Sequence, residues 1–169
     1  MKYGLAPLSC LNPVVLVLGS LPGDESIRRQ EYYGNPRNMF WRVLATVFED
    51  TVPISYSEKK AFLAKHKVAL WDVFASAERD GSLDANIRDT SCNDIPGFLN
   101  ENPSIKTIAL NGGKASKAFR QMKKMFPSCF TQVKIISFTS TSPLSISAGW
   151  PFERIVEQWK QILTAYKEI

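Results

Sequence analysis

Residues 14–23 have the sequence VVLVLGSLPG, in which five apolar residues are followed by a turn rich in glycine and proline. A short apolar run that ends in turn residues predicts a buried β-strand. In an open α/β protein, such a strand brings the residues that follow it to the carboxyl edge of the sheet, where ligands bind. We therefore expect segment 19–23 to border a ligand site.

The rest of the chain alternates between apolar runs typical of strands and stretches with helical periodicity. Strands are predicted over 68–74, 105–110 and 133–138, and helices over 38–50, 57–66 with Ser57 as N-cap, 95–100, 114–126 and from Pro151 onward. The polar stretch 75–94 is predicted to be a long loop. This alternation favours a three-layer α/β/α sandwich with a central, mostly parallel four-stranded sheet. The turns after three of its strands are rich in Gly or Ser/Thr and are expected to meet at one edge.

The composition is that of a globular protein with a basic surface. Of the 169 residues, 44% are hydrophobic, so residues 1–169 are expected to form a single domain. No apolar run approaches the ~20 residues that span a bilayer, and residues 1–12 are too weakly apolar for a signal peptide. The three cysteines lack metal-site spacing, which favours a reduced, cytoplasmic protein. A monomer is expected. The net charge of +5 is compatible with a polyanionic partner.

Residues 28–41 concentrate arginines, amides and aromatic rings. Rings stack on a base, amides bind its edge and cations bind phosphate, so this composition suits a pocket for an unstacked nucleobase. The G-x-S-x-G, H-E-x-x-H and Walker A motifs are absent from the sequence. The single histidine, His66, ends a predicted surface helix, where it is expected to interact with the helix dipole rather than act as a base.

Six short blocks, in the same order along nearly the whole chain, resemble the uracil-DNA glycosylase superfamily and most closely its hypoxanthine-DNA glycosylase family. The blocks are GSLPG (19–23), YYGNPRNMFW (32–41), LWDV (70–73), GSLDANI (81–87), LNG (110–112) and STSP (140–143). The second and fourth blocks are specific, whereas G-x-x-P-G alone is not.

The resemblance implies that the first block is the loop that shapes the base site. Many relatives carry Asn or Asp before its proline, but this chain has Leu21, which cannot orient a water molecule. The resemblance to the hypoxanthine-DNA glycosylase family instead places the catalytic amide at Asn38. Taken by itself, Asn38 is predicted to be the N-cap of the helix that follows it, and the two roles are compatible.

The resemblance also implies residues for binding the base and the DNA. The base-binding set is Gly19, Ser20, Leu21, Pro22, Gly23, Tyr33, Phe40 and Asn111, and the DNA-binding set is Arg37, Ser140, Thr141, Ser142, Pro143 and Leu144. Each has a simpler alternative: core packing for the aromatic residues, a turn for Asn111, solvation for Arg37 and a surface loop for 140–147. The wedge that fills the gap left by the extruded base is either Leu144 or Ile146. Asp72 and Asp84 are expected to orient neighbouring loops.

The function implied is that of a monofunctional DNA glycosylase, which hydrolyses the bond between the sugar and a deaminated base and leaves an abasic site. Hypoxanthine is the favoured substrate and uracil a second one, in double-stranded or single-stranded DNA. Neither a metal nor an organic cofactor is implied, and Lys114 is expected to be solvated rather than a Schiff-base nucleophile. The alternatives are a uracil- or mismatch-preferring glycosylase of a neighbouring family and a catalytically silent DNA-binding relative.

Overall fold

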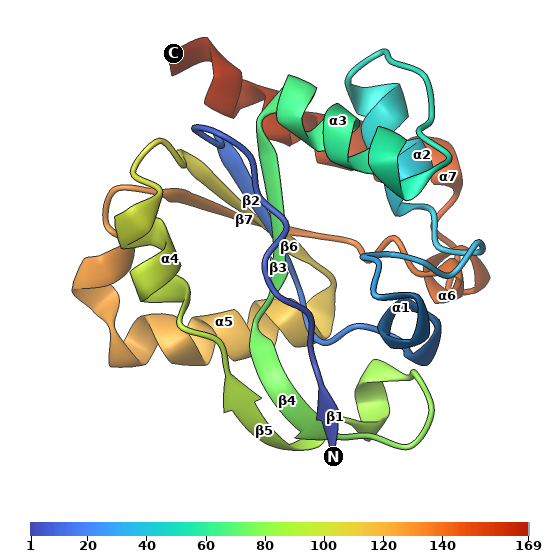
Figure 1. Ribbon diagram of the computed structural model, residues 1–169, viewed down its shortest axis with the longest axis vertical. Helices are drawn as coiled ribbons and strands as arrows, with labels where there is room; N and C mark the ends of the chain where they lie inside the picture. Colours follow the sequence, from blue (N-terminus) through green and yellow to red (C-terminus); the bar gives the residue numbers. More distant parts are fainter. Residues whose placement is uncertain (169) are drawn as a thin grey trace.

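The centre of the protein, in a computed structural model that describes residues 1–168, is a parallel four-stranded sheet (Figure 1). Its strands, in spatial order, are β3 (Val68–Asp72), β2 (Val15–Gly19), β6 (Thr107–Asn111) and β7 (Lys134–Phe138). All residues of β2 and β6 are buried, as their unbroken apolar runs require in the middle of a sheet covered on both faces. The predicted four-stranded parallel sheet is confirmed.

Helices cover both faces of this sheet, because alternate residues of its strands point to opposite sides. Val15 and Val17 belong to one core, with α2 (Phe40–Val47), α3 (Tyr56–His66) and α7 (Phe152–Trp159). Leu16 and Leu18 belong to the other core, with α4 (Ile95–Glu101) and α5 (Gly113–Met125). Figure 1 shows these two helical layers on either side of the strands, which confirms the three-layer sandwich.

A second, antiparallel sheet was not predicted. It has the order β1 (Lys2–Tyr3), β4 (Phe74–Glu78), β5 (Arg88–Cys92). The predicted strand 68–74 therefore ends at Asp72, and the predicted loop 75–94 contains most of β4, a 3₁₀ turn (Asp84–Asn86) and β5. The prediction of a loop was wrong because every residue of β5 is exposed, so the strand has no apolar alternation to reveal it.

Smaller differences concern helix boundaries. The N-cap of α3 is Ser55 rather than Ser57: its side chain accepts a 3.0 Å hydrogen bond from the Glu58 N–H. Pro151 is the N-cap residue of α7 and not its first helical residue. The remaining short elements are α1 (Asp24–Arg29), η2 (Pro127–Phe130), α6 (Pro143–Ser147) inside the expected loop 139–149, and η3 (Lys160–Glu168).

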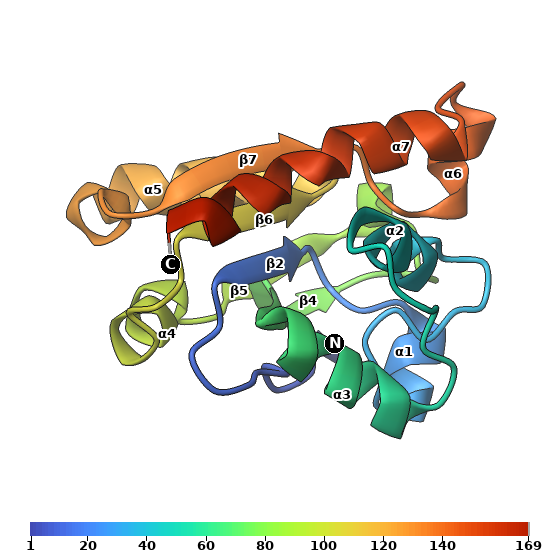
Figure 2. The same ribbon diagram turned by 90° about the horizontal axis from the view of Figure 1, so that it is seen from above.

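The four parallel strands end at a common edge. Gly19 is in register with Asp72, and Asn111 with Phe138. Figure 2 shows α1, α2 and α6 gathered at the end toward which the arrows of β2, β6 and β7 point. The loops after β2, β6 and β7 are thereby brought together at this edge, as expected. Among residues 1–168, no helix has the length and apolar character needed to cross a membrane.

Candidate active site

A cavity of about 500 Å³ opens at the carboxyl edge of the parallel sheet. It collects residues from the loops after β2 and β7, from the end of β6, from the segment before α2 and from α6. The predicted site residues that line it are Gly19, Ser20, Leu21, Pro22, Gly23, Tyr33, Asn38, Asn111, Ser140, Thr141, Ser142, Pro143 and Leu144. Residues from four separate blocks of the sequence therefore share one cavity.

Two predicted site residues do not line the cavity. Phe40 is fully buried in the core, with its ring stacked on Tyr33 at a centroid distance of 3.9 Å. Tyr33 is the ring that faces the cavity, so Phe40 supports it from behind and its expected contact with a base is not direct. Arg37 is exposed outside the lining residues, where its side chain is free to meet a phosphate but not a base.

Asn38 has an amide oxygen held by two donors. Its Oδ1 accepts hydrogen bonds from the backbone N–H of Phe40, at 3.0 Å, and from the hydroxyl of Thr141, at 2.8 Å. The first of these bonds reaches the opening turn of α2, as expected of a capping side chain. The N-cap residue of α2 is Met39, however, one position after Asn38. Because both hydrogen bonds are made to Oδ1, the NH₂ group of Asn38 has no partner among the residues described.

Asn111 connects two walls of the cavity. From the end of β6, its Nδ2 donates to the hydroxyls of Tyr33 and Thr141, at 3.2 and 3.1 Å, and its Oδ1 accepts a 3.0 Å bond from the Thr141 N–H. Asn111 is 7% exposed and Thr141 is fully buried. In this structure Asn111 thus holds Tyr33 and Thr141 in place, and its two N–H groups are already engaged.

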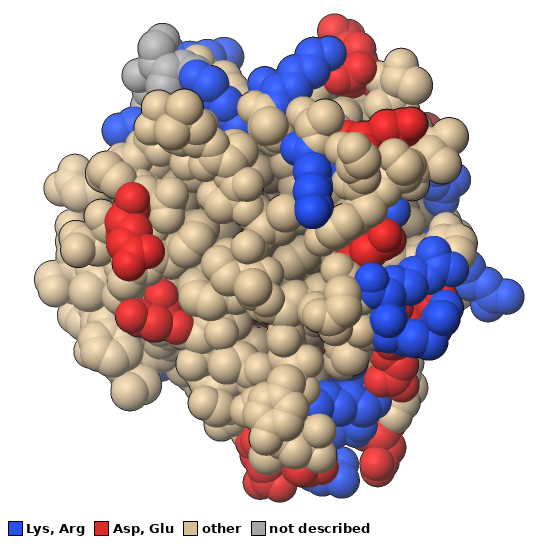
Figure 3. Space-filling model, in the orientation of Figure 1, with Lys and Arg blue, Asp and Glu red and all other residues tan. Residues whose placement is uncertain are grey.

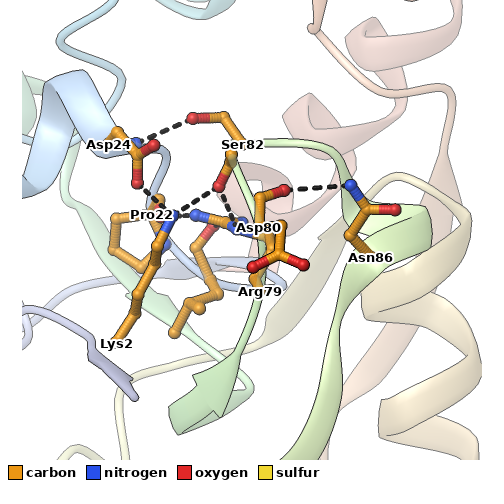
Figure 4. Close-up of polar contacts among 9 residues, drawn as sticks. Lys2, Pro22, Asp24, Arg79, Asp80, Ser82 and Asn86 are labelled. Atoms are coloured by element: carbon orange, nitrogen blue, oxygen red, sulfur yellow. Dashed lines mark hydrogen bonds and ion pairs between the residues drawn. The ribbon is translucent and has the colours of Figure 1, made fainter.

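The loop 19–23 is held from below by a residue that sequence reasoning missed. The buried guanidinium of Arg79, at the end of β4, donates to the carbonyl oxygens of Leu21 and Pro22 and, at 3.1 Å, to that of Gly81 (Figure 4). Lys2 reaches the same Gly81 carbonyl at 2.6 Å. An arginine next to the block 81–87 was the only sequence signal for this role, because its partners are backbone atoms far away in the chain.

A second set of contacts joins this loop to the segment 80–86. Lys2 pairs with Asp24, and the Asp24 N–H donates to Ser82 Oγ at 2.9 Å (Figure 4). Closer to the cavity, Ser20 donates a 2.6 Å hydrogen bond to Asp84. Asp84 therefore orients the loop 19–23, which is the role expected of it.

Asp72 lies at the end of β3 and lines the cavity with only 4% of its surface exposed. Burial and the negative charge of Asp84 raise the pKa of Asp72 to about 7, against a smaller opposing effect of Arg79. A side chain at Gly19 would place its Cβ 2.5 Å from Asp72 Oδ1. The Asp72 carboxyl group therefore fits in its position only because residue 19 has no side chain.

Apolar and basic groups lie near the cavity mouth. The α6 side chains Leu144 and Ile146 are 57% and 49% exposed, on a helix whose first turn is capped by Ser142. Exposed apolar side chains next to a cavity suit insertion between stacked bases.

Figure 3 shows Lys and Arg side chains gathered over α1, beside acidic ones. On that helix, Arg28 and Arg29 pair with Glu25 at 2.5 and 2.6 Å.

Comparisons with known proteins agree with this geometry. A family model described as "Uracil DNA glycosylase superfamily" matches residues 6–160. A hypoxanthine DNA glycosylase of Methanosarcina acetivorans is 41% identical over 118 residues, which are 69% of this chain and 75% of that protein. A hypoxanthine DNA glycosylase of Methanosarcina barkeri is 39% identical over 117 residues, which are 69% of this chain and 74% of that protein. An NMR structure from Methanosarcina acetivorans, described as a candidate uracil DNA glycosylase, superimposes with a TM-score of 0.78 at 31% identity, over 95% of this chain and 98% of the other.

Proposed function

Because this chain belongs to the uracil DNA glycosylase superfamily and is a DNA glycosylase, we propose that it removes hypoxanthine from DNA with Asn38 as its catalytic amide. The observation that carries the proposal is the place of Asn38 in the cavity, with its orientation set by Thr141 and the start of α2. Uracil is a second substrate of the same cavity.

The reaction breaks the bond between C1′ of the sugar and the ring nitrogen of the base. The bonding electron pair leaves with the base, positive charge develops on the sugar, and a water oxygen then bonds to C1′ and loses a proton. An amide is a weak base, but this reaction gains most from a positioned water and a stabilised leaving group. Asn38 positions the water through its NH₂ group, since its oxygen is already bonded, and the backbone of loop 19–23 lines the same cavity.

The cavity accepts a base taken out of the helix. Its volume of about 500 Å³ lies within the range of small-molecule sites and is large enough for a purine. Tyr33 offers its ring as a stacking surface, supported by Phe40. The hydroxyls of Ser140 and Ser142 are offered to phosphates, whereas Thr141 is fully buried and bonded to Asn38 and Asn111. Leu144 and Ile146 occupy the space the base leaves.

Water, rather than a lysine, is the nucleophile of this proposal. Lys114, near the start of α5, is not among the residues that line the cavity. Borohydride is therefore expected to trap no covalent adduct between protein and DNA, and a trapped adduct would point to a lysine nucleophile.

The test is cleavage of synthetic DNA. Single-stranded and duplex oligonucleotides that carry one hypoxanthine, uracil or xanthine are incubated with the protein, and abasic sites are then cleaved with alkali. We expect product from hypoxanthine, and faster product than from uracil. Preference for uracil would favour a glycosylase of a neighbouring family, and binding without any product would indicate a silent relative. Affinity should fall as salt concentration rises, because cations contact the phosphates.

A further inference from the structure

One carboxyl oxygen in the cavity wall has no partner. Oδ2 of Asp72 is fully buried and forms no hydrogen bond with any residue from 1 to 168. Buried polar atoms in folded proteins are nearly always paired, because an unpaired one costs free energy. An unpaired atom in the wall of a substrate cavity points to a partner that arrives with the substrate.

The surroundings of Asp72 hold it in place without engaging its carboxyl group. Its backbone oxygen accepts a 2.8 Å hydrogen bond from Asn93, and Gly19 next to it presents no side chain. The nearby guanidinium of Arg79 is bonded to backbone carbonyls instead. Oδ2 therefore has no competing partner among residues 1–168, and Asp72 belongs to the wall of the cavity.

We propose that Asp72 is a second catalytic residue, an acid that transfers its proton to the N7 nitrogen of the extruded hypoxanthine. As the C1′–N9 bond breaks, its electron pair moves into the base and the Asp72 proton bonds to N7, so the base departs neutral. Water supplies the oxygen that bonds to C1′, and its released proton restores the acid. This inference rests on the proposed function, because it requires a purine in the cavity.

The charges around Asp72 favour its neutral form. Asp84, on the 3₁₀ turn, acts on it with a negative charge. Burial and, to a smaller extent, the charge of Asp72 raise the pKa of the neighbouring Tyr32 and Tyr33 hydroxyls, so these groups stay neutral. Arg79 at the end of β4 opposes Asp84 but does not cancel its effect or that of burial, so the pKa of Asp72 is about 7. Below that pH the group carries the proton that an acid must donate.

A proton donor at this place distinguishes purines from pyrimidines. Hypoxanthine has a basic nitrogen, N7, in the same five-membered ring as N9, the atom whose bond to the sugar breaks. Uracil has no such atom and leaves as a stabilised anion. Loss of the Asp72 proton is therefore expected to slow hypoxanthine removal more than uracil removal. Asp72 would thus contribute to substrate preference as well as to rate.

The decisive variant is Asp72→Asn, which keeps the shape and a hydrogen-bond donor but cannot transfer a proton. Single-turnover rates on duplex hypoxanthine DNA are measured from pH 5 to pH 9. The single-turnover rate of the wild type should fall by about tenfold per pH unit above pH 7. The rate of Asp72→Asn should be about 10²- to 10⁴-fold lower than that of the wild type at pH 6 and should not fall above pH 7. Asp80→Asn is the matched control, because Asp80 is exposed and does not line the cavity.

A second variant tests the charge of the neighbour. Asp84→Asn removes a negative charge that raises the pKa of Asp72, so the fall in rate should move to lower pH. The proposal is overturned if the rate of Asp84→Asn begins to fall at the same pH as that of the wild type. It is also overturned if Asp72→Asn has the wild-type rate at pH 6. If Asp72→Asn fails to fold, a wild-type rate that does not fall above pH 7 overturns it as well.

These outcomes separate the two proposals. Equal cleavage of hypoxanthine by the wild type and Asp72→Asn removes the role of Asp72 but leaves the function intact. A wild type that cleaves uracil and not hypoxanthine overturns both, because no N7 atom then receives the proton.

Discussion

The hydroxyl of Thr141 donates a 2.8 Å hydrogen bond to the amide oxygen of Asn38, 103 positions earlier in the chain. The Thr141 oxygen in turn accepts a bond from Asn111, so the three side chains form a relay with one direction. Both lone pairs of Asn38 Oδ1 are engaged, by Thr141 and by the N–H of Phe40. The proposed catalytic amide is therefore oriented before any substrate binds, which is what preorganised catalysis requires.

Replacement of Asn38 by alanine should reduce the single-turnover rate by about 10²- to 10³-fold, because the water loses the group that positions it. The loss of the hydrogen bond to Phe40 should also lower the free energy of unfolding by about 1 kcal/mol. Base-release assays and urea unfolding measure the two effects. Asn100→Ala, at an exposed site on α4, is the control. Wild-type activity in Asn38→Ala would refute the assignment but not the function.

Replacement of Thr141 by valine keeps the side-chain shape and removes the hydroxyl between Asn38 and Asn111. We expect kcat to fall by about tenfold or more with KM nearly unchanged, since a small misplacement of a catalytic group is costly. Thr141→Ser should restore most of kcat because it retains the hydroxyl. If valine and serine variants behave alike, the hydroxyl does not orient Asn38.

Arg79 should be the residue outside the cavity on which the loop 19–23 most depends. Arg79→Ala leaves the carbonyls of Leu21 and Pro22 without this donor and that of Gly81 with Lys2 alone, and should lower the free energy of unfolding by about 2–4 kcal/mol. Thermal unfolding measures this change. Arg88→Ala, at an exposed position of β5, should change stability by less than about 0.5 kcal/mol. Similar stability of the two variants would contradict the role given to Arg79.

Leu144 and Ile146 should matter for duplex DNA only. Their double replacement by alanine removes the apolar groups that fill the gap in the base stack, so cleavage of a duplex should slow by about tenfold. Cleavage of single-stranded DNA should stay the same, because there is no stack to refill. Ile54→Ala, which alters a side chain 83% exposed elsewhere, is the control. An equal loss on both substrates would exclude a wedge.

Asp72 should make the folded protein less stable as the pH rises. Its pKa is about 7 in the folded protein and near 3.8 when unfolded, so folding favours the protonated form. The stability it contributes is present below pH 4 and is lost as the pH rises through 7, by up to about 4 kcal/mol at pH 8. Asp72→Asn carries no such charge, so its stability relative to the wild type should increase between pH 5 and pH 8. Urea unfolding at these two values measures the difference, and a constant difference would contradict the raised pKa.

Much of the architecture follows from local patterns. The apolar run 14–18 and its counterpart in β6 are buried throughout, as the two central strands of a sheet covered on both faces require. The outer strands β3 and β7 keep apolar runs as well, although β7 is only partly buried. The exposed strand β5 has no such pattern, and its pairing with β4 depends on where the chain lies after Asp72. Sequence reasoning therefore found the parallel sheet and missed the antiparallel one.

By itself, the sequence determined the three-layer fold, the edge where the strands end and the residue types that gather there, because hydrophobic periodicity and turn residues act over short distances along the chain. Only the tertiary structure decided which of these residues cooperate. The contacts of Asn38 with Thr141, of Asn111 with Tyr33 and of Arg79 with Leu21 join positions 58 to 103 residues apart. The unpaired oxygen of Asp72 likewise arises from burial in a folded wall. Hydrogen bonds and desolvation depend on distances in space, which no local pattern records.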